Sequence, residues 1–432
     1  MNFSDSEIVA AVMTENNYEA ISDSLGADVV FLNTCSIRDH AEQRVLNRLK
    51  ELQSLRKQNP KLIIGVLGCM AERLKGALLE EQELGMRVDM VVGPDAYRDL
   101  PQLMLDAESG HKAVNIILSA EETYADITPV RYAAGGVSAF ISIMRGCENF
   151  CAYCVVPFTR GKERSRNPDS ILREAGELYT KGYREITLLG QNVNSYKWQE
   201  TGGSQLISFP RLLDMVAGVS PQLRIRFATS HPKDLSAELL RVMASHPNIC
   251  RAVHLPVQSG SSSVLKRMNR KYSREDYMRR VQDIRQVLPG CALSTDIITG
   301  YCGETEEEFN DTLSLMEWAA FDYAFMFKYS ERPGTLAAKK MKDDVPEEVK
   351  TRRLEKVIKL QQQLSWQSNR QDVGKTFEVL VEGYSKRSKE HVSGRNSMNK
   401  VVVFPDKGYK PGDYVMVNIL DCSSATLKGE AV

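Results

Sequence analysis

Three cysteines in one short segment constrain this chain more than any other part of its sequence. The segment Cys147-Glu-Asn-Phe-Cys151-Ala-Tyr-Cys154 places thiols four and three residues apart, so all three can point into one small volume. Thiolates are soft ligands that suit iron–sulfur clusters and zinc. A structural zinc site is closed by four ligands, whereas a 4Fe–4S cluster held by three cysteines leaves one iron open to a small molecule. Since no fourth Cys or His lies nearby, the spacing favours the open cluster over zinc, a disulfide or a packing cluster.

Length and composition are those of an ordinary globular protein of two or three domains. The chain has 432 residues, 42% of them hydrophobic, and its 56 Lys and Arg residues equal its 56 Asp and Glu residues, which neither supports nor excludes a nucleic-acid partner. The longest apolar run, residues 62–71, is about half as long as a membrane span requires, and the start of the chain shows no signal segment. Nine cysteines, three of them clustered, fit metal ligation in a reducing compartment. We therefore expect a cytoplasmic protein with no membrane partner.

The N-terminal part alternates strand patterns with helix patterns. Residues 27–32, 61–67 and 88–92 are short apolar runs, and residues 5–15 and 42–58 carry apolar side chains at helical spacing. Strands that alternate with helices form parallel sheets with crossover helices. We therefore predict an α/β fold whose N-terminal domain contains a Rossmann-like parallel sheet.

Two further cysteines follow strands of this predicted sheet. Cys35 comes just after the first strand and Cys69 just after the second, so both are expected at the carboxyl edge, where such folds bind ligands. A lone cysteine in such a loop is usually a core or incidental thiol. Two at equivalent positions predict a second metal site with about even odds.

Six more strand patterns follow a weakly patterned connector, separated by helical patterns such as residues 167–181, 273–287 and 305–319. The six strands are expected at residues 139–144, 185–190, 223–228, 252–255, 292–298 and 323–328. Parallel strands in this order suggest an open, partial (β/α)6 barrel, with its chemistry at the C-terminal ends of the strands.

Polar residues and glycines gather where these strands end, and we expect about half of them to contact a bound small molecule. The candidates are Gly190, Gln191, Asn192, Ser230, Gln258, Asp296 and Gly300. His231 and His254 also lie at strand ends, but a lone histidine there is more often a hydrogen-bonded scaffold residue, so we rank both below the cysteines.

The last sixty or so residues change character. After a long helical pattern at residues 346–372, five short strand patterns separated by Gly and Pro predict a small antiparallel β-barrel of the OB-like kind that binds oligonucleotides. Residues 375–400 contain six basic and three acidic side chains. The candidates for RNA contact are Lys386, Arg387, Lys389 and Arg395.

The cysteine motif after the strand at residues 139–144 resembles the signature of radical S-adenosylmethionine (SAM) enzymes. The run Val155-Val-Pro157-Phe-Thr-Arg160-Gly161-Lys-Glu-Arg-Ser165-Arg166 narrows the resemblance to the methylthiotransferases, and the likeness covers nearly the whole chain. It implies an N-terminal methylthiotransferase domain at residues 1–125, a radical SAM core with its connector helix at 133–372, and an RNA-binding TRAM domain at 374–432.

The resemblance implies two 4Fe–4S clusters and SAM as cofactors. Cys147, Cys151 and Cys154 would hold the cluster that binds SAM, while Cys35 and Cys69 match the second and third ligands of an auxiliary cluster. The first ligand of that set is missing: in relatives it lies in a Gly-Cys-Gln-Met-Asn segment, and this sequence starts at the equivalent of Met-Asn. We expect the opening strand and its cysteine to be absent from the chain as given.

The same resemblance implies contacts for SAM. In the superfamily, the segment after the second strand contacts the methionyl amino group, and Gly190-Gln191-Asn192 is similar in place. The run from Asp296 to Gly300 resembles the motif near the adenine.

The segments Phe327-Lys-Tyr-Ser330, His254-Leu-Pro-Val-Gln258 and Asn399-Lys-Val-Val-Val-Phe404 look most like the branch of the family that acts on tRNA. That branch adds a methylthio group to C2 of N6-isopentenyladenosine adjacent to the anticodon, with tRNA and an electron donor of unknown identity as partners. One SAM would methylate a sulfur at the auxiliary cluster and a second would supply the radical that activates the adenine C–H bond.

Two other functions stay open from the sequence. The first is the same chemistry on an aspartate of a ribosomal protein, as in the protein-modifying branch of the family. The second is a non-catalytic tRNA-binding iron–sulfur protein, which the absent first cysteine makes plausible.

Overall fold

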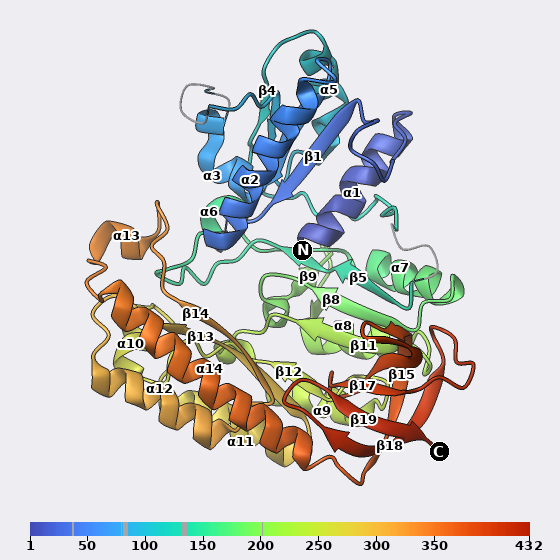
Figure 1. Ribbon diagram of the computed structural model, residues 1–432, viewed down its shortest axis with the longest axis vertical. Coiled ribbons are helices and arrows are strands. Elements are labelled where there is room, and N and C mark those ends of the chain that lie inside the picture. Colours follow the sequence, from blue (N-terminus) through green and yellow to red (C-terminus); the bar gives the residue numbers. More distant parts are fainter. Residues whose placement is uncertain (37–38, 79, 81–84, 132–135, 201) are drawn as a thin grey trace. The chain divides into compact units, whose positions relative to one another are not determined.

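The structure is a computed structural model that describes residues 1–432 except 37–38, 79, 81–84, 132–135 and 201 (Figure 1). It contains two compact units. Unit 1 comprises Met1–Ala134, Met144–Phe150 and Cys154–Arg166, and unit 2 comprises Gly135–Ile143, Cys151–Tyr153 and Asn167–Val432. The cysteine motif is therefore shared, since Cys147 and Cys154 belong to unit 1 and Cys151 to unit 2. The domain boundaries expected from the sequence stay predictions.

Unit 1 is built on a parallel sheet, as predicted. Its strands β1 (Val29–Thr34), β2 (Ile63–Gly68), β3 (Met90–Val92) and β4 (Ala113–Asn115) pair in chain order, each parallel to the next. Parallel strands need their faces covered, because their residues are apolar on both sides. Both faces of this sheet are covered by helices.

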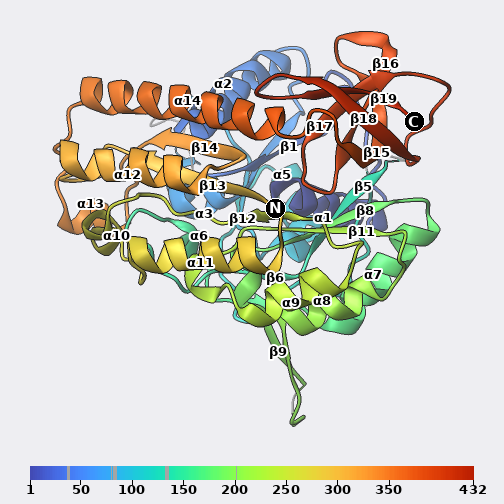
Figure 2. The ribbon, with the colours of Figure 1, turned by 90° about the horizontal axis from the view of Figure 1, so that it is seen from below.

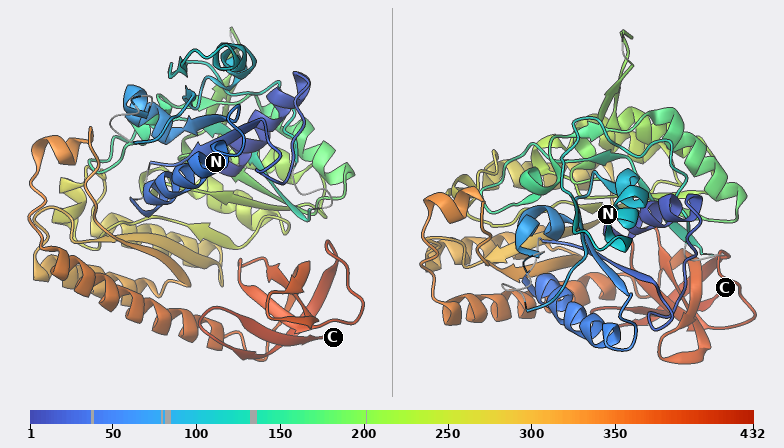
Figure 3. Two further views of the ribbon diagram at one scale, coloured as in Figure 1. Left: turned by 45° about the horizontal axis from the view of Figure 1, so that its top comes forward. Right: turned by 90° about the horizontal axis from the view of Figure 1, so that it is seen from above.

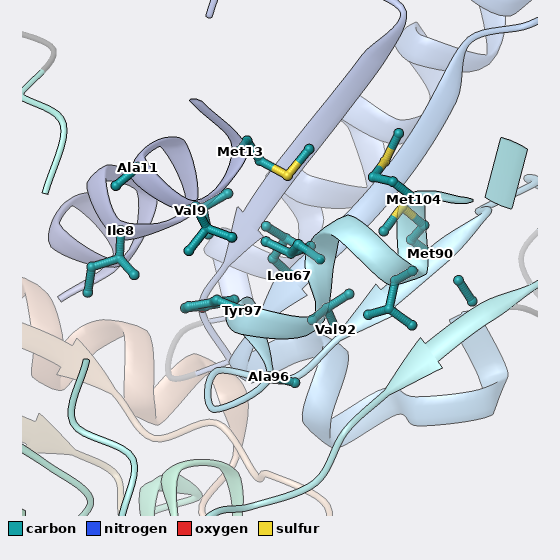
Figure 4. Packing of buried hydrophobic residues seen from close by; sticks show 14 of the residues in the cluster. Ile8, Val9, Ala11, Met13, Leu67, Met90, Val92, Ala96, Tyr97 and Met104 are labelled. Atoms are coloured by element: carbon teal, nitrogen blue, oxygen red, sulfur yellow. The ribbon is translucent and has the colours of Figure 1, made fainter. Parts of the chain in front are cut away.

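One face of the sheet packs against α1 (Asn2–Glu15) and α5 (Leu100–Glu108) through a buried cluster that includes Val9, Val92 and Met104 (Figure 4). The other face packs against α2 (Asp39–Arg56) and α3 (Cys69–Leu74). Leu49 and Leu52, two apolar residues of the helical pattern at residues 42–58, are fully buried there. Short 3-10 helices η1 (Lys75–Leu78) and η2 (Tyr97–Asp99) complete the described connections of this sheet. The helical patterns at residues 5–15 and 42–58 are thus confirmed, within a few residues at their ends.

Unit 2 contains the six predicted strands of the central region, all parallel to their partners but divided between two sheets. The first sheet joins β5 (Ser138–Ser142), β8 (Glu185–Leu189) and β11 (Arg224–Ala228), and the second joins β12 (Ala252–His254), β13 (Ala292–Thr299) and β14 (Tyr323–Lys328). The six strands of the predicted partial barrel are therefore present, as two three-stranded parallel sheets. Between the two sheets, one isolated parallel bridge pairs Ile225 of β11 with Ile249, three residues before β12.

Helices separate these strands in the order that the sequence predicts. They are α7 (Pro168–Thr180), α8 (Phe209–Ala217), α9 (Ala237–Ser245), α10 (Ser262–Arg267), α11 (Arg274–Val287) and α12 (Glu306–Ala319), with 3-10 turns η3 (Val193–Ser195) and η4 (Pro232–Asp234) after β8 and β11. Helices α11 and α12 each begin with a capping box, Ser273 with Asp276 and Thr305 with Glu308. A hairpin of β9 (Lys197–Gln199) and β10 (Leu206–Ser208) projects from this part of unit 2 (Figure 2).

After α13 (Leu336–Lys340), the long helix α14 (Glu347–Arg370) leads into a closed five-stranded barrel (Figure 3). The barrel strands are β15 (Thr376–Ser385), β16 (Ser388–Asn396), β17 (Val401–Pro405), β18 (Tyr414–Cys422) and β19 (Leu427–Ala431), in the order β15-β16-β17-β19-β18. The predicted small barrel is confirmed, with one correction: β17 and β19 pair in parallel, and this pair closes the barrel.

The barrel is tied to the first sheet of unit 2 by two arginines of β11. Arg224 donates to the main-chain oxygen of Arg395 at 2.7 Å, and Arg226 donates to that of Asn396 at 2.8 Å. Arg226 also pairs with Glu185 of the neighbouring strand at 2.8 Å. Because main-chain oxygens at the end of β16 accept these bonds, this attachment does not depend on the side chains of Arg395 and Asn396.

No helix in the described part of the chain is both long enough and apolar enough to cross a membrane.

Candidate iron–sulfur and SAM site

The loop that carries Cys147 is framed in unit 1 by a short antiparallel pair, β6 (Met144–Arg145) with β7 (Arg164–Ser165). Between them Gly146 adopts a positive φ of 81°, and a Cβ atom there would stand 1.8 Å from the main-chain oxygen of Lys162. Only glycine allows so close an approach of the two chain segments. The approach lets the amide of Cys147 donate to the oxygen of Gly161 at 3.1 Å, which fixes the start of the cysteine motif.

The sulfur of Cys147 accepts a hydrogen bond from Asn149 Nδ2 at 3.4 Å. On the far side of the motif, Cys154 is followed by the short helix α6 (Val156–Arg160). Phe150 and Phe158 meet edge to face with ring centres 6.2 Å apart, so the loop packs against its own helix.

In unit 2, Cys151 is buried and its neighbour Ala152 is held from both sides. The amide of Ala152 donates to Met268, at the end of α10, and its oxygen accepts from Ala337 of α13. The sulfur of Cys151 accepts a hydrogen bond from Arg270 Nη1 at 3.1 Å. Hydrogen bonds of this kind are common around iron–sulfur clusters, where they stabilise the thiolate form of the ligand.

Cys35 and Cys69 lie directly after β1 and β2, and the last residues of these strands, Thr34 and Gly68, are paired in register. The two cysteines therefore follow neighbouring strand ends, as expected from the sequence. Gly68 has a φ of 88°, which lets the chain turn sharply from β2 into α3 at Cys69. Thr34 Oγ1 accepts from the amide of Met70 at 3.2 Å and so ties this turn to β1.

A buried ionic cluster lies beside Cys69 in unit 1. Asp5 accepts from Arg145 at 2.9 Å and from Arg160 at 2.7 Å, and Arg160 Nε also donates to the sulfur of Cys69 at 3.2 Å. Burial alone would raise the pKa of Asp5, but the charges of Arg145 and Arg160 outweigh it and lower the pKa to about 2. Asp5 therefore stays ionised near neutral pH.

The donor chemistry of the cysteine motif fits an iron–sulfur cluster, because its three thiols are soft ligands and two of them accept N–H···S bonds. Among the described residues, however, no three His, Cys, Asp or Glu side chains are gathered closely enough to hold a metal ion. The ligand roles of Cys147, Cys151 and Cys154, and of Cys35 and Cys69, thus stay predictions.

Strand-end residues of the first sheet in unit 2 are joined by hydrogen bonds. Asn192 donates to Asp234 at 2.7 Å and accepts from the amide of His231 at 3.0 Å, while Ser230 donates to Asn194 at 3.1 Å. These bonds use most of the hydrogen-bonding capacity of the Asn192 and Ser230 side chains. Two buried polar atoms here, Gln191 Oε1 and Asn194 Nδ2, have no hydrogen-bond partner among the described residues, so they are free to bind a ligand.

Two candidates of the second sheet are part of its hydrogen-bonded edge. Asp296 lies inside β13, within the strand predicted at residues 292–298 and three residues before the observed end at Thr299. Gln258 adopts a φ of 73° and exchanges main-chain hydrogen bonds with Asp296 and Ile298, so it extends the sheet edge.

Gly190 directly follows β8, whereas Gly300 is committed to the scaffold of unit 2. The amide of Gly300 donates to Glu304 at 2.6 Å, and a Cβ atom there would stand 2.4 Å from Cγ of Lys350 in α14. Close helix packing explains this glycine without a ligand.

The two histidines behave as scaffold residues, as ranked from the sequence. Burial, together with the charges of Arg270 and Lys233, lowers the pKa of His231 to about 2, so its ring stays neutral. His254 bonds to Ser294 at 3.0 Å and packs edge to face on Phe325.

The four predicted RNA contacts lie on β16 or on the turn before it. Lys386 and Arg387 occupy the β15–β16 turn and Lys389 the start of β16, and all three are exposed. Arg395 is already engaged, because its side chain donates to Glu382 at 3.1 Å and to Asn399.

Residue-level reasoning missed Arg270 and Asn194. Arg160 was within reach of the sequence, because it follows the cysteine motif closely and an arginine there can pair with a carboxylate, as it does with Asp5. Arg270 is 119 positions away from the cysteine that it contacts, and no spacing pattern links them.

Three family models match successive parts of the chain. An uncharacterized protein family, UPF0004, matches residues 1–93, the radical SAM superfamily matches residues 141–316, and the TRAM domain matches residues 370–432.

Curated relatives match the whole chain. The tRNA-2-methylthio-N(6)-dimethylallyladenosine synthase of Phocaeicola vulgatus is 57% identical, over 100% of this chain and 94% of the relative. The synthases of Bacteroides fragilis and Flavobacterium johnsoniae are 55% and 53% identical, over 100% of this chain and 93% and 92% of theirs. The chain belongs to the tRNA-2-methylthio-N(6)-dimethylallyladenosine synthase family. The predicted membership in the radical SAM methylthiotransferases is therefore confirmed.

Solved structures support the fold of this synthase family member. The radical SAM methyltransferase TsrM of Kitasatospora setae, with cobalamin and a 4Fe–4S cluster bound, superposes with a TM-score of 0.58 at 14% identity, covering 77% of this chain and 70% of that one. The cobalamin-dependent radical SAM enzyme OxsB gives a TM-score of 0.53 at 13% identity, covering 83% of this chain and 53% of that one. At such identities the likeness concerns the fold alone.

Proposed function

We propose that this protein adds a methylthio group to C2 of N6-isopentenyladenosine adjacent to the anticodon of tRNA. The observation that carries the proposal is 57% identity, over the full chain, with a synthase named for the product of this reaction. The chain is accordingly an enzyme, a radical SAM transferase, and the superfamily indicates a 4Fe–4S cluster and SAM as cofactors.

We assign Cys147, Cys151 and Cys154 as ligands of the cluster that binds SAM. Three soft donors at this spacing and the N–H···S bonds to Cys147 and Cys151 support the assignment. When bound, the cluster supplies the electron that cleaves SAM. The protein's part is to hold the thiolates, orient SAM and keep water away from a reactive species.

We propose that the strand-end residues of unit 2 bind SAM. Gln191 and Asn194 are the strongest of these, since each offers a buried polar atom with no partner among the described residues. Gly190, Asn192, Ser230, Gln258 and Asp296 complete the proposed set, and Gly300 contributes only by shaping the loop after β13 through its packing against α14. Asn192 and Ser230 act chiefly by positioning, because their own hydrogen bonds fix the loops after β8 and β11.

We propose that Cys35 and Cys69 belong to an auxiliary cluster, supported by their place at neighbouring strand ends. Two thiols are one fewer than the three-cysteine set that the family resemblance implies. The chain as given therefore does not fit the auxiliary cluster fully, and we assign no step of the reaction to this edge.

The substrate assignment rests on the TRAM match and on the names of the relatives. The exposed side chains of Lys386, Arg387 and Lys389 are suited to phosphate contacts, which add affinity without reading sequence. A base in an anticodon loop is single-stranded and can enter a pocket without melting a duplex. Since tRNA and reduced thiols are both found in the cytoplasm, we propose that the reaction takes place there. The remaining partner is a low-potential electron donor.

The reconstituted protein, with dithionite and SAM, should convert the base in isopentenylated tRNA and leave unmodified tRNA and ribosomes unchanged, as measured by mass spectrometry of nucleosides and ribosomal proteins. Replacing Cys147, Cys151 and Cys154 by alanine should abolish both the product and 5′-deoxyadenosine. A Cys250→Ala variant is the matched control, because Cys250 is a buried thiol just before β12 and does not belong to the motif.

Modification of a ribosomal aspartate, with none on tRNA, would overturn the substrate assignment. Binding of tRNA without any 5′-deoxyadenosine would indicate the non-catalytic alternative. Iron content separates one cluster, roughly four irons per chain, from two clusters, roughly eight.

A further inference from the structure

Arg270 is a buried cation without a carboxylate partner in the described part of the chain. Its side chain belongs to unit 2 and is only 4% exposed, and within the described residues it makes no ion pair with Asp or Glu. Two other buried arginines of unit 2 differ in this respect, since Arg224 pairs with Glu378 and Arg353 pairs with Glu304.

All three nitrogens of the Arg270 guanidinium donate hydrogen bonds. Nε donates to Tyr272 Oη at 2.9 Å, Nη2 donates to the main-chain oxygen of Pro256 at 2.8 Å, and Nη1 donates to the sulfur of Cys151 at 3.1 Å. Tyr272 Oη in turn donates to the oxygen of Val257 at 2.9 Å, so the phenol presents a lone pair to Arg270. The guanidinium is therefore held in one orientation with one edge directed at the sulfur.

The backbone around Arg270 is bent to achieve this orientation. Asn269 and Lys271, on either side of it, adopt left-handed conformations with φ of 56° and 55°. Such conformations are unfavourable for residues other than glycine and persist where the surroundings impose them. The same turn is anchored to the cysteine motif, because the oxygen of Met268 accepts from the amide of Ala152.

Burying a guanidinium costs several kcal/mol unless an anion compensates it. A main-chain oxygen and a phenol provide dipoles but no charge, and burial raises the pKa of Tyr272 to about 12, so the phenol stays neutral. His231, edge to face on Tyr272, is neutral as well. Among the described residues that hydrogen-bond to the guanidinium, Cys151 is the one that would carry a negative charge, as a cluster ligand.

We propose that Arg270 is a positioning residue for the SAM-binding cluster, whose hydrogen bond to the Cys151 sulfur makes the cluster easier to reduce. The inference rests on the proposed ligand role of Cys151. The step concerned is the uptake of one electron by the oxidised cluster from a low-potential one-electron donor, which is itself oxidised by one electron. Hydrogen bonds to cluster sulfurs and nearby positive charge favour the reduced, more negative state.

The test is a redox titration of the full-length protein with reconstituted cluster, followed by electron paramagnetic resonance. Every sample carries Cys35→Ala and Cys69→Ala, so that only the motif cluster contributes. In Arg270→Met, the ratio of reduced to oxidised cluster at a fixed potential should fall about tenfold, which corresponds to 59 mV for a one-electron couple. Arg270→Lys, which keeps the charge but not the fork of donors, should give a smaller fall.

Arg267→Met is the matched control. Arg267 lies three residues earlier, and its side chain pairs with Glu308 at 2.6 Å, not with a sulfur. The Arg267→Met variant should leave the reduction potential of the cluster unchanged. An unchanged potential in Arg270→Met, or an equal shift in both variants, would overturn the proposal.

A different readout covers the case in which the Arg270 variants do not fold or hold iron. In the reduced protein with isotope-labelled arginine, electron–nuclear double resonance should detect a guanidinium nitrogen and an exchangeable proton coupled to the cluster. Absence of that coupling overturns the role of Arg270. Absence of any iron–sulfur signal from the parent protein would instead refute the proposed ligand set, so the two failures are distinguishable.

Discussion

The pKa of Glu72, in unit 1, is determined by the surroundings of its side chain. Its side chain lies buried on α3, three residues after Cys69, and Oε2 has no hydrogen-bond partner among the described residues. Lys75 approaches the other oxygen only to 3.9 Å. Burial raises the pKa of Glu72 to about 7, with the Lys75 charge opposing and the Asp95 charge adding to the rise.

The raised pKa predicts a stability that depends on pH in a defined window. Between the ordinary pKa of 4.5 and about 7, the unfolded chain releases a proton that the folded protein keeps, so stability falls as pH rises. Glutamine has no titrating proton, so replacing Glu72 by glutamine removes this loss of stability. We expect Glu72→Gln to raise the free energy of unfolding by about 3 kcal/mol at about pH 8 and by little at about pH 5, as measured by urea denaturation.

The exposed Glu51 on α2 provides the control, and Glu51→Gln should change stability little at either pH. Equal stabilisation by Glu72→Gln at both pH values would show that its carboxylate is not the titrating group.

Among the elements, the β6–β7 pair decides the geometry of the cysteine motif. Each of these strands has only two residues, too few to fix the loop between them. The geometry of the loop is therefore set by the close approach of Gly146 to the main chain of Lys162. The sequence shows a glycine before Cys147, but only the partner segment at Lys162 explains why that position excludes a side chain.

A substitution at Gly146 should therefore disturb metal binding. Gly146→Ala puts a Cβ atom 1.8 Å from a main-chain oxygen, so the chain must move and take the amide of Cys147 away from Gly161. We expect the variant to lose most of its iron after reconstitution, as measured by iron content and visible absorbance.

Gly110→Ala separates this clash from simple backbone strain. Gly110 has nearly the same φ, 82°, but nothing lies within 4 Å of a Cβ atom there. Both variants bear the left-handed cost of about 1 to 2 kcal/mol, while Gly110→Ala should keep its iron. Full iron content in Gly146→Ala would contradict the proposed role of this turn.

For the molecule as a whole, the attachment of the C-terminal barrel matters most within unit 2. Arg224 is buried, donates to the oxygen of Arg395 and to Glu378, and stacks on Tyr414 with its Cζ 5.1 Å from the ring centre. Tyr414 Oη donates to the oxygens of Arg184 and Gln222. A proposed RNA-binding barrel is thereby held at a set position on the parallel sheet of β5, β8 and β11.

Removing the arginine should loosen the barrel. Arg224→Met loses hydrogen bonds from a charged donor, worth about 2 kcal/mol, so the undocked population should rise roughly thirtyfold. We expect faster proteolytic cleavage between α14 and β15, at residues 371–375, as measured by native-state proteolysis and mass spectrometry.

The matched substitution is Arg211→Met on α8, where the arginine is exposed and pairs only with Asp214 three residues away. It should leave the cleavage rate unchanged. Equal rates for Arg224→Met and the parent protein would mean that other contacts hold the barrel.

The sequence by itself determined the local features of this protein. Alternating apolar runs predicted the strands and helices because burial follows the period of each element. The spacing of Cys147, Cys151 and Cys154 predicted an iron–sulfur motif because short spacings allow three soft ligands to point into one small volume. Family membership followed from the same short runs.

Only the tertiary structure decided which residues from distant segments meet. It divided the six central strands between two sheets, joined Gln258 to the edge of β13, and committed Gly300 to helix packing. It also brought Arg160 to Cys69 and Arg270 to Cys151, from 91 and 119 positions away. The physical reason is that a buried charge is placed by partners that the folded chain brings together, and these partners leave no period or spacing in the sequence.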